Sequence, residues 1–441
     1  MIKYIDLFAG IGGIRLGFTA ALAKQGIASK CVLSSEIDSR ACYTYEVNFG
    51  ECPSGDIRKI DDIPPFDMML AGFPCQPFSY AGKKQGFGDT RGTLFFEIER
   101  ILEKYKPKAF LLENVRGLKT NDGGRTYETI ISSLEKIGYG THALVLNSSD
   151  FGVPQNRVRL YILGIYGATP MMSLKSGFGA ADSHKFKHNY MQPSLVELDR
   201  LVTGQNRSCY VRSSQLEPAS KGTPWVKDIL EQKVDEKYFC TDIFTQQLRD
   251  AIGDDFTKLH GYRLIDYRGG QSLHSWELGT KGKCTPQEIT FMNKLIQNRR
   301  RHTFGTHQDG KKLTKGQIQT FYMDNDIDGV MASLISKSYL KEDNGRYNPV
   351  CGNMSFEIFK FLDPDSISIT LTSSDANRLG VVQDNRPRRI TPRECARLQG
   401  FPDDFAIHPE DGYAYKQFGN SVSVPVIEAV IEDFLCRNKI I

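Results

Sequence analysis

The stretch "DLFAGIGGIRLGF", residues 6–18, joins a short apolar run to an amphipathic one. Glycines between a strand and a helix let the backbone approach a ligand at the helix N-terminus. The dinucleotide fingerprint needs G-x-G-x-x-G, and Gly10 and Gly12 supply its first half, but Arg15 takes the place of the third glycine. The stretch therefore predicts a strand–loop–helix unit that binds a nucleoside and argues against a nicotinamide dinucleotide. A tight turn without a ligand is the alternative.

The first 165 residues alternate apolar runs with amphipathic stretches, which is typical of a parallel sheet with helices on both faces. We predict strands at residues 4–8, 30–34, 67–70, 109–112, 142–146 and 160–165, and helices within residues 93–105 and 126–138. The rhythm is lost near residue 166 and returns near residue 388, with one helix in residues 390–400 and another after Pro425. We therefore predict a split α/β domain, residues 1–166 and 388–441, with an inserted domain, residues 167–387.

The composition excludes several classes of protein. The chain has 441 residues and a formal net charge of +4, which is a mild lean toward an anionic partner. Its ten cysteines include no C-x-x-C pair, so neither a zinc ribbon nor a thioredoxin-like motif is indicated, and we expect no metal. The N-terminus does not resemble a signal peptide, and no run of 18 apolar residues occurs, so we expect a cytoplasmic protein without membrane spans.

Two acidic residues extend the hypothesis of a nucleoside site. Glu36 ends the second predicted strand in "SSEID", where a carboxylate can accept hydrogen bonds from ribose hydroxyls. Asp56, in "SGDI", adds a second acid after the next segment. A glycine loop with a ribose carboxylate and a second acid, but without a pyrophosphate site, fits a nucleoside such as S-adenosylmethionine (SAM).

A further set of residues follows the predicted strands. Cys75, in "GFPCQPFS", comes after the third strand, and Glu113, in "LLENV", comes after the fourth. Ligands of open α/β sheets bind outside the carboxyl ends of strands, so we expect both side chains in one crevice. Arg157 and Arg159, in "QNRVRLYILG", approach from a neighbouring loop. Taken singly, these residues also read as a buried thiol, a helix cap and a solvated strand edge.

Together the set suits a pyrimidine substrate. A thiolate adds to C6 of the ring, a carboxyl group holds N3 and the exocyclic amine, and an arginine holds O2. Addition at C6 makes C5 electron-rich, so C5 can take a methyl group from SAM before the C5 proton and the thiol leave.

In this order, the motifs resemble the DNA (cytosine-5) methyltransferases, specifically the single-chain prokaryotic enzymes of restriction–modification systems. The resemblance is carried by "DLFAGIGG", "EID", "GDI", "GFPCQPFS", "ENV", "QNRVRLYILG", "RRITPRECARLQGFP" and "GNSVSVPV", and it covers roughly residues 1–168 and 388–441. It implies a Rossmann-like SAM-dependent methyltransferase domain with an inserted target-recognition domain. It also implies methyl transfer to C5 of a flipped-out cytosine in a specific duplex DNA sequence, with S-adenosyl-L-homocysteine as the second product.

The resemblance assigns roles to particular residues. Cys75 is implied to be the nucleophile that bonds covalently to C6, and Glu113 the acid on the cytosine edge. Arg157 and Arg159 are implied to anchor the base and its backbone, with Arg159 the closer match to the base contact. The residues implied to bind SAM are Phe8, Ala9, Gly10, Gly12, Gly13, Glu36, Ile37, Asp56, Ile57, Pro74, Leu94, Asn420 and Ser421. The loop of residues 80–92 resembles a lid over bound DNA, with DNA contacts from Gln76, Ser79, Lys83, Lys84 and Arg91.

The inserted segment corresponds to the family's target-recognition region. Its most basic stretch is residues 298–317, and there we predict DNA contacts from Arg299, Arg300, Arg301, Lys311 and Lys312. A solvated helix end and hairpin is the alternative. We interpret His274 and Trp276 as packing residues, and Thr370 with Leu371 as the family's matched pair near the end of the segment.

Two other functions are alternatives to DNA methylation. The tRNA-modifying branch of the superfamily carries a "CFT" motif, and this chain has only "FCT" at residues 239–241. A catalytically silent nucleic-acid-binding relative would typically lack the thiol or the glutamate, and both are present. The expected partners are double-stranded DNA and a restriction endonuclease encoded nearby, for which the chain would be the protective methylase. We also expect a monomer that associates with the nucleoid.

Overall fold

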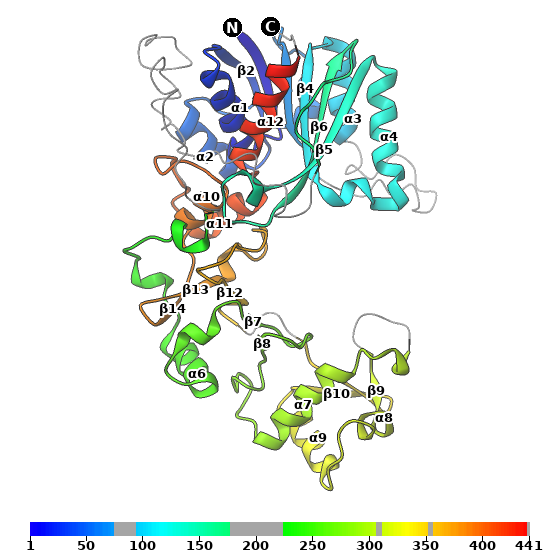
Figure 1. Ribbon diagram of the computed structural model, residues 1–441, viewed down its shortest axis with the longest axis vertical. Helices are drawn as coiled ribbons and strands as arrows, with labels where there is room; N and C mark the ends of the chain where they lie inside the picture. The colour runs from blue at the N-terminus through cyan, green and yellow to red at the C-terminus, as the bar shows by residue number, and fades with distance from the viewer. Residues whose placement is uncertain (75–93, 177–223, 306–310, 352–355, 439–441) are drawn as a thin grey trace. The chain divides into compact units, whose positions relative to one another are not determined.

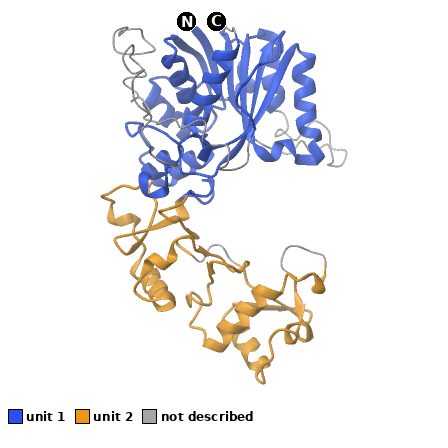
Figure 2. Cartoon of the chain, viewed as in Figure 1, with its two compact units in different colours: residues 1–229, 367–376, 392–441 blue, residues 230–366, 377–391 orange. Residues whose placement is uncertain are grey.

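The computed structural model describes residues 1–74, 94–176, 224–305, 311–351 and 356–438. The chain forms two compact units, shown in Figure 2. Unit 1 comprises residues 1–229, 367–376 and 392–441, and unit 2 comprises residues 230–366 and 377–391. Each unit is described by itself.

Unit 1 is built on a six-stranded sheet in the order β2-β1-β3-β4-β6-β5 (Figure 1). The strands are β1 Ile2–Leu7, β2 Ser29–Ser35, β3 Met68–Gly72, β4 Ala109–Val115, β5 Tyr139–Asn147 and β6 Val158–Tyr166. Pairs β1–β2, β1–β3 and β3–β4 are parallel, whereas β6 lies antiparallel between β4 and β5. All six predicted strands are present, and the predicted α/β class with a mostly parallel sheet is confirmed.

The reversal of β6 matters for the edge of the sheet. In the β4–β6 register, Glu113 is opposite Tyr161 and Val115 is opposite Arg159. The first residues of β6 therefore lie at the edge where β3 and β4 end. This is why Arg157, directly before β6, and Arg159, its second residue, lie at the same edge of the sheet as Glu113 near the end of β4.

Helices cover both faces of this sheet. The helices of unit 1 are α1 Gly13–Lys24, α2 Ser39–Phe49, α3 Leu94–Tyr105, α4 Arg125–Lys136, α10 Pro392–Leu398, α11 Asp411–Asn420 and α12 Val424–Arg437. Buried residues of α1 and α12 share one core with Met68 and Leu70 of β3, and those of α3 and α4 share the other core with Met69 and Ala71. Successive strand side chains point to opposite faces, so β3 supplies both cores. Each fully buried aliphatic or aromatic side chain contributes about 1.5–3 kcal/mol.

Unit 2 contains two smaller sheets. One has the order β14-β13-β12-β7-β8 and the other β10-β11-β9. The strands are β7 Arg263–Leu264, β8 Ser272–Leu273, β9 Leu313–Thr314, β10 Leu340–Asp343, β11 Arg346–Pro349, β12 Lys360–Phe361, β13 Leu379–Gln383 and β14 Arg386–Arg389. The helices are α6 Asp242–Ile252, α7 Pro286–Asn298, α8 Lys315–Gln319 and α9 Ile327–Ser336. Trp276 is 1% exposed and stacks on His274 with ring centroids 4.5 Å apart, which agrees with the interpretation of both as packing residues.

The boundaries of the units differ from the predicted domain boundaries. Residues 367–376 belong to unit 1, because their main chain bonds to the segment before β6. There the Ser368 N–H donates to the Pro154 carbonyl at 2.7 Å, and the Asn156 N–H donates to the Ser368 carbonyl at 2.8 Å. Residues 388–391 belong to unit 2, where β14 pairs with β13. Main-chain pairing of this kind leaves no mark in the composition of the sequence.

Across the residues that the structure describes, no helix combines the length and the apolar character needed to cross a membrane.

Candidate active site

A cavity of about 660 Å³ lies in unit 1 at the carboxyl ends of β1, β2, β3 and β4. The start of β6 and the segment after α11 complete its lining. Parallel strands place their carboxyl ends at one edge, which is where open α/β sheets bind ligands. The cavity contains predicted cofactor residues and predicted catalytic residues in one continuous lining.

The glycine loop between β1 and α1 forms one wall. Phe8, Gly10 and Gly12 have φ angles of 53°, 55° and 86°, in the left-handed region. A Cβ added to Gly10 would meet no atom within 4 Å, so the backbone there borders open space. A Cβ added to Gly12 would lie 2.2 Å from the ring of Phe49 in α2. The cavity lining does not include Gly12, which packs against Phe49 of α2. This position differs from the predicted cofactor contact of Gly12.

Glu36 is fixed by main-chain donors directly after β2. Its Oε2 accepts a hydrogen bond from the Gly10 N–H at 2.8 Å. Its Oε1 accepts from the N–H groups of Ile37 at 2.8 Å and Asp38 at 2.9 Å. A carboxylate offers about four acceptor sites and these bonds use three, so Oε2 can still accept a hydrogen bond from a ligand hydroxyl. The glycine loop and the predicted ribose carboxylate therefore form one rigid unit.

Other predicted SAM-binding residues also line the cavity or lie near it. Ile37 lines the cavity with its side chain 74% exposed, and Ile57 and Leu94 line it as well. Asp56 accepts hydrogen bonds from the Arg58 guanidinium, at 2.9 Å from Nε and 2.6 Å from Nη2. These bonds hold the pKa of Asp56 below its usual value. An exposed apolar side chain beside a fixed acid suits a flat heterocycle with an exocyclic amine.

The last residue of α11 and the residue after it complete the cavity beside the glycine loop. Asn420 and Ser421 both line it. A Cβ added to Gly13 would lie 2.7 Å from the Ser421 Oγ, so only glycine lets the C-terminal segment reach the loop. Open space beside Gly10, a carboxylate with free acceptor capacity and an uncovered isoleucine together fit the adenosine part of SAM.

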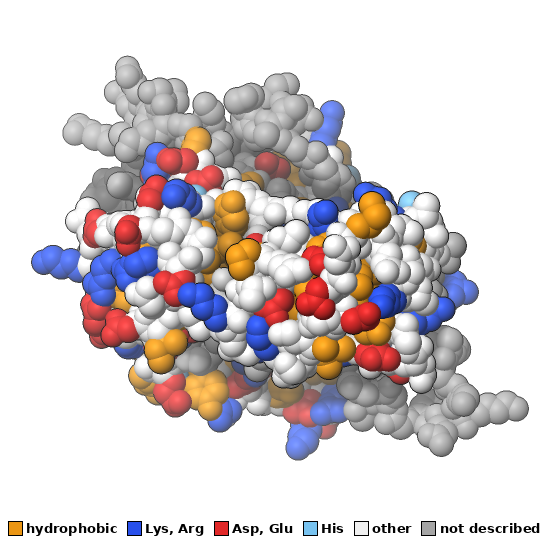
Figure 3. Space-filling model, turned by 90° about the horizontal axis from the view of Figure 1, so that it is seen from below, with side chains coloured by type: hydrophobic (Ala, Val, Ile, Leu, Met, Phe, Trp, Pro, Cys, Tyr) orange, Lys and Arg blue, Asp and Glu red, His pale blue; other side chains and the backbone are white. Residues whose placement is uncertain are grey.

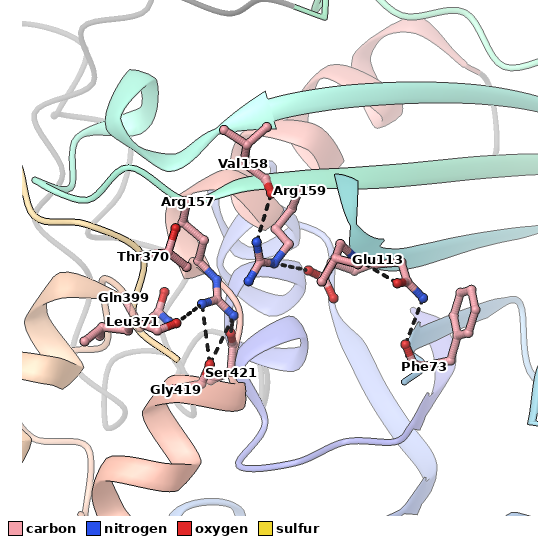
Figure 4. A network of polar contacts seen from close by, with 12 residues as sticks. Phe73, Glu113, Arg157, Val158, Arg159, Thr370, Leu371, Gln399, Gly419 and Ser421 are labelled. Carbon is pink, nitrogen blue, oxygen red and sulfur yellow. Dashed lines mark hydrogen bonds and ion pairs between the residues drawn. The ribbon is translucent and has the colours of Figure 1, made fainter. Parts of the chain in front are cut away.

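Glu113 and Arg159 form the pair nearest to the predicted chemistry. The Arg159 Nε lies 3.5 Å from the Glu113 Oε1, and Arg159 Nη1 donates to the Val158 carbonyl at 2.9 Å (Figure 4). Burial raises the pKa of Glu113, and the positive charges of Arg159 and Arg157 partly oppose this effect. A carboxyl group with a raised pKa keeps its proton to a higher pH and can donate a hydrogen bond to a ring nitrogen.

Arg157 lines the cavity, but its guanidinium is occupied by the protein main chain. Arg157 is 3% exposed, and its Nη1 donates to the Leu371 carbonyl at 2.7 Å. Both terminal nitrogens reach the Gly419 carbonyl at 3.4 Å, and Nη2 also donates to the Ser421 carbonyl (Figure 4). Burial and the nearby Arg159 lower the pKa of Arg157 to about 9. This arrangement differs from the predicted anchor on the target base.

The residues directly before the predicted nucleophile Cys75 are held in place by a side-chain hydrogen bond. Asn114 Nδ2 donates to the Phe73 carbonyl at 3.0 Å, which ties the chain after β3 to β4. Pro74 follows and lines the cavity. Cys75, Gln76, Ser79, Lys83, Lys84 and Arg91 lie outside the described residues. Sequence reasoning treated "ENV" only as a motif and gave Asn114 no role of its own.

The predicted DNA contacts of unit 2 separate into two groups. Arg299 is 2% exposed and donates to Asn348 Oδ1 at 2.7 Å and to the Tyr267 carbonyl at 3.2 Å. Its predicted DNA contact is therefore inconsistent with the structure, because Arg299 is the C-cap residue of α7 and its side chain is buried against Asn348 and Tyr267. Arg301 and Lys312 are exposed, and Lys312 pairs with Asp343. Arg300 and Lys311 are half-buried, and no DNA contact of these four residues is tested by the structure.

On the face drawn in Figure 3, Lys and Arg side chains are interspersed with Asp and Glu side chains. This distribution agrees with the small net charge of the chain. Among the residues with described positions, His, Cys, Asp and Glu form no group of three that could hold a metal ion.

The chain is similar to known proteins along its whole length. The family model for C-5 cytosine-specific DNA methylase matches residues 2–436. Type II methyltransferase M.BanI of Aneurinibacillus aneurinilyticus is 61% identical over 437 residues, which is 99% of this chain and 96% of that protein. M.HgiCI of Herpetosiphon aurantiacus is 59% identical over 433 residues, covering 98% and 97%. M.NlaIV of Neisseria lactamica is 38% identical over 465 residues, covering 98% and 99%.

Proposed function

Because this chain belongs to the C-5 cytosine-specific DNA methylase family, we propose that the cavity of unit 1 is the site where it methylates a cytosine of duplex DNA. The chain is a SAM-dependent DNA (cytosine-5) methyltransferase. The observation that carries the assignment of the site is that the glycine loop, Glu36, Glu113 and Arg159 line one cavity. The target base is stacked inside a duplex, so it must be extruded at a cost of a few kcal/mol before it can enter.

The residues of the chain then have separate tasks. The Cys75 thiolate adds to C6 of the cytosine and forms a C–S bond, while the Glu113 carboxyl group donates its proton toward N3. Arg159 holds O2 and stabilises negative charge on the ring. Bound SAM supplies an electrophilic methyl group. After C5 has accepted that group, a base removes the C5 proton, the C–S bond breaks, Cys75 leaves as a thiolate and the N3 proton returns to Glu113.

The cofactor contacts follow from the described residues. Glu36, whose Oε2 has one acceptor site left, would accept from a ribose hydroxyl, and the open space beside Gly10 would hold the ligand. Ile37 covers the adenine face, and Asp56 accepts from the adenine amine. Asn420 and Ser421 hold the amino acid end of the cofactor against the glycine loop.

A methylation assay with matched cysteine variants tests this function. Purified protein is incubated with labelled SAM and either mixed-sequence duplex DNA or tRNA. We expect label on cytosine of the duplex, loss of turnover in Cys75→Ser, and normal turnover in Cys52→Ser, because Cys52 is an exposed free thiol. Label on tRNA alone would favour the tRNA-modifying branch. Turnover by Cys75→Ser would refute the thiol mechanism.

We further infer that the chain shares its target sequence with M.BanI and M.HgiCI. In this family the inserted segment reads DNA, and identities of 61% and 59% extend over 99% and 98% of the chain, so they include that segment. The test is sequencing of methylated DNA from methylation-free hosts that express each protein separately. One shared methylated motif is the expected result, and different motifs would contradict the inference.

The printed names of these relatives also place them among Type II methyltransferases. We propose that this chain likewise protects host DNA, as a cytoplasmic monomer on the nucleoid, against an endonuclease encoded nearby. Host DNA extracted after expression of the chain should resist the cognate endonuclease of the shared motif, and DNA from a Cys75→Ser host should be cut.

A further inference from the structure

Arg157 joins two segments that are far apart in the sequence (Figure 4). Leu371 belongs to residues 367–376, and Gly419 and Ser421 end α11 and follow it. The guanidinium donates to carbonyl oxygens of both segments, at 2.7 Å to Leu371 and 3.4 Å to Gly419. A buried charge is tolerated when its donors are matched by acceptors, and main-chain carbonyls provide acceptors for both terminal nitrogens here, whereas Nε has no hydrogen-bond partner among the described residues.

Each of these segments has a different relation to function. Gly419, Asn420 and Ser421 line the cavity proposed for SAM. Residues 367–376 continue along the chain into unit 2 at both ends, since unit 2 comprises residues 230–366 and 377–391. Arg157 therefore bonds the cofactor side of the cavity to one of the chain segments that connect to unit 2, which is also connected at residues 229–230 and 391–392.

The surroundings of Arg157 reinforce this junction. Gln155 Oε1 accepts a hydrogen bond from the Leu371 N–H at 2.9 Å, and Gln155 Nε2 donates to the Leu398 carbonyl at 2.8 Å. A Cβ added to Gly419 would lie 2.4 Å from the Ser373 nitrogen. Neither segment can shift by an ångström without disturbing the other, because backbone approaches backbone at this point.

We propose that Arg157 is a positioning residue that couples binding of SAM to binding of the DNA target, and that it does not contact the target base. The inference rests on the proposed SAM cavity. Its physical basis is the planar fork of the guanidinium, which offers five donors and spans several carbonyls at once, whereas a lysine ammonium is a single point with three donors. Arg159, two residues later, is the arginine that pairs with the Glu113 carboxyl group.

The variant Arg157→Lys tests this assignment because it keeps the charge and removes the fork. Affinity for S-adenosyl-L-homocysteine without DNA is expected to fall about tenfold or more, the effect of losing roughly one well-made hydrogen bond. The factor by which S-adenosyl-L-homocysteine tightens duplex binding should fall toward one. The single-turnover rate with both ligands saturating should fall less than the affinity does.

Two outcomes would overturn the proposal. One is normal cofactor affinity in Arg157→Lys with a fall of about a hundredfold in the single-turnover rate, which is the behaviour of a group that acts on the reacting base. The other is wild-type protein whose duplex affinity is the same with and without S-adenosyl-L-homocysteine. Failure of wild-type protein to methylate any DNA would instead refute the proposed function.

A second variant, Gly419→Ala, disturbs the same pair of segments without changing Arg157. Gly419→Ala leaves Arg157 intact but forces Ser373 away, so it should reproduce the loss of cofactor affinity and of coupling. Arg125→Lys is the matched control, because Arg125 is exposed on α4 and pairs with Asp122. Thermal unfolding without ligands identifies any variant that fails to fold. Normal coupling in a folded Gly419→Ala protein would also contradict the proposal.

Discussion

Two walls of the cavity hold their acidic groups by different means. Glu36, on the cofactor wall, accepts three main-chain N–H bonds of 2.8–2.9 Å. Glu113, on the target wall, is buried beside the Arg159 guanidinium at 3.5 Å, and burial raises its pKa. The fold itself therefore fixes the group that positions the cofactor, whereas side-chain charges tune the group that contacts the base. Substitutions on the target wall should change rates and pH dependence, and substitutions on the cofactor wall should change affinity.

The largest effect is expected from Glu113→Gln. Glutamine keeps the shape but removes the acidic proton, and general acid catalysis contributes about 10²–10⁴-fold. The single-turnover methylation rate should fall by that factor, while the affinity for S-adenosyl-L-homocysteine stays unchanged. Glu128→Gln, an exposed acid on α4, is the control and should behave as wild type. A large loss of cofactor affinity in Glu113→Gln would remove the distinction between the walls.

Arg159→Met should combine a slower reaction with a shifted pH profile. Loss of a hydrogen bond from a charged donor to the base would lower kcat/KM about 10–100-fold. The Arg159 charge lowers the pKa of Glu113, so its removal raises that pKa further. The reaction uses the protonated acid and is lost as pH rises through this pKa. The basic limb of the profile of kcat/KM against pH should therefore move to higher pH, and a shift to lower pH would contradict the electrostatic account of this wall.

The two walls were not equally predictable from the sequence. Glu36 and Glu113 were placed at strand ends because apolar runs and helical periodicity located the strands, and parallel strands bring their ends to one edge. The partners of Arg157 could not be predicted, because carbonyl groups of Leu371, Gly419 and Ser421 belong to the main chain and carry no residue signature. The reversed direction of β6 was likewise invisible in its apolar pattern.

The burial of Arg299 is encoded in its helical spacing. The basic run suggested DNA, but Arg299 follows Leu295 by four residues and Met292 by seven, on the buried face of α7. Helical spacing therefore places Arg299 on the side of the core, whereas a positive charge alone does not indicate whether a side chain faces the core or the solvent. Its neighbours are less buried: Arg300, four residues after Ile296, is half-buried, and Arg301 is exposed.

Glu36→Gln tests the cofactor wall at its main-chain bonds. The glutamine amide nitrogen cannot accept a hydrogen bond, so at least one of the three N–H donors loses its partner. The same nitrogen cannot accept from a ribose hydroxyl, and loss of one hydrogen bond to a charged acceptor costs about 1.5–3 kcal/mol, which corresponds to roughly a 10–150-fold loss of SAM affinity. Titration calorimetry with SAM measures this loss. The single-turnover rate at saturating SAM should stay close to wild type, and a rate loss as large as that of Glu113→Gln would contradict the comparison.

The smallest effects are expected from alanine at two glycines of the same loop. In Gly12→Ala the new Cβ would lie 2.2 Å from the Phe49 ring, so thermal unfolding should show a loss of about 1–3 kcal/mol from overpacking, in addition to the backbone strain of a residue with φ of 86°. In Gly10→Ala the Cβ meets no atom within 4 Å and enters the cavity, so only the backbone strain of about 1–2 kcal/mol affects stability. SAM affinity should fall more in Gly10→Ala, because its methyl group occupies space that the ligand needs. In a rigid loop, Gly10 borders the ligand and Gly12 packs against α2, so the two variants should differ in SAM affinity. Equal losses of affinity would mean that the loop is flexible and would contradict this description.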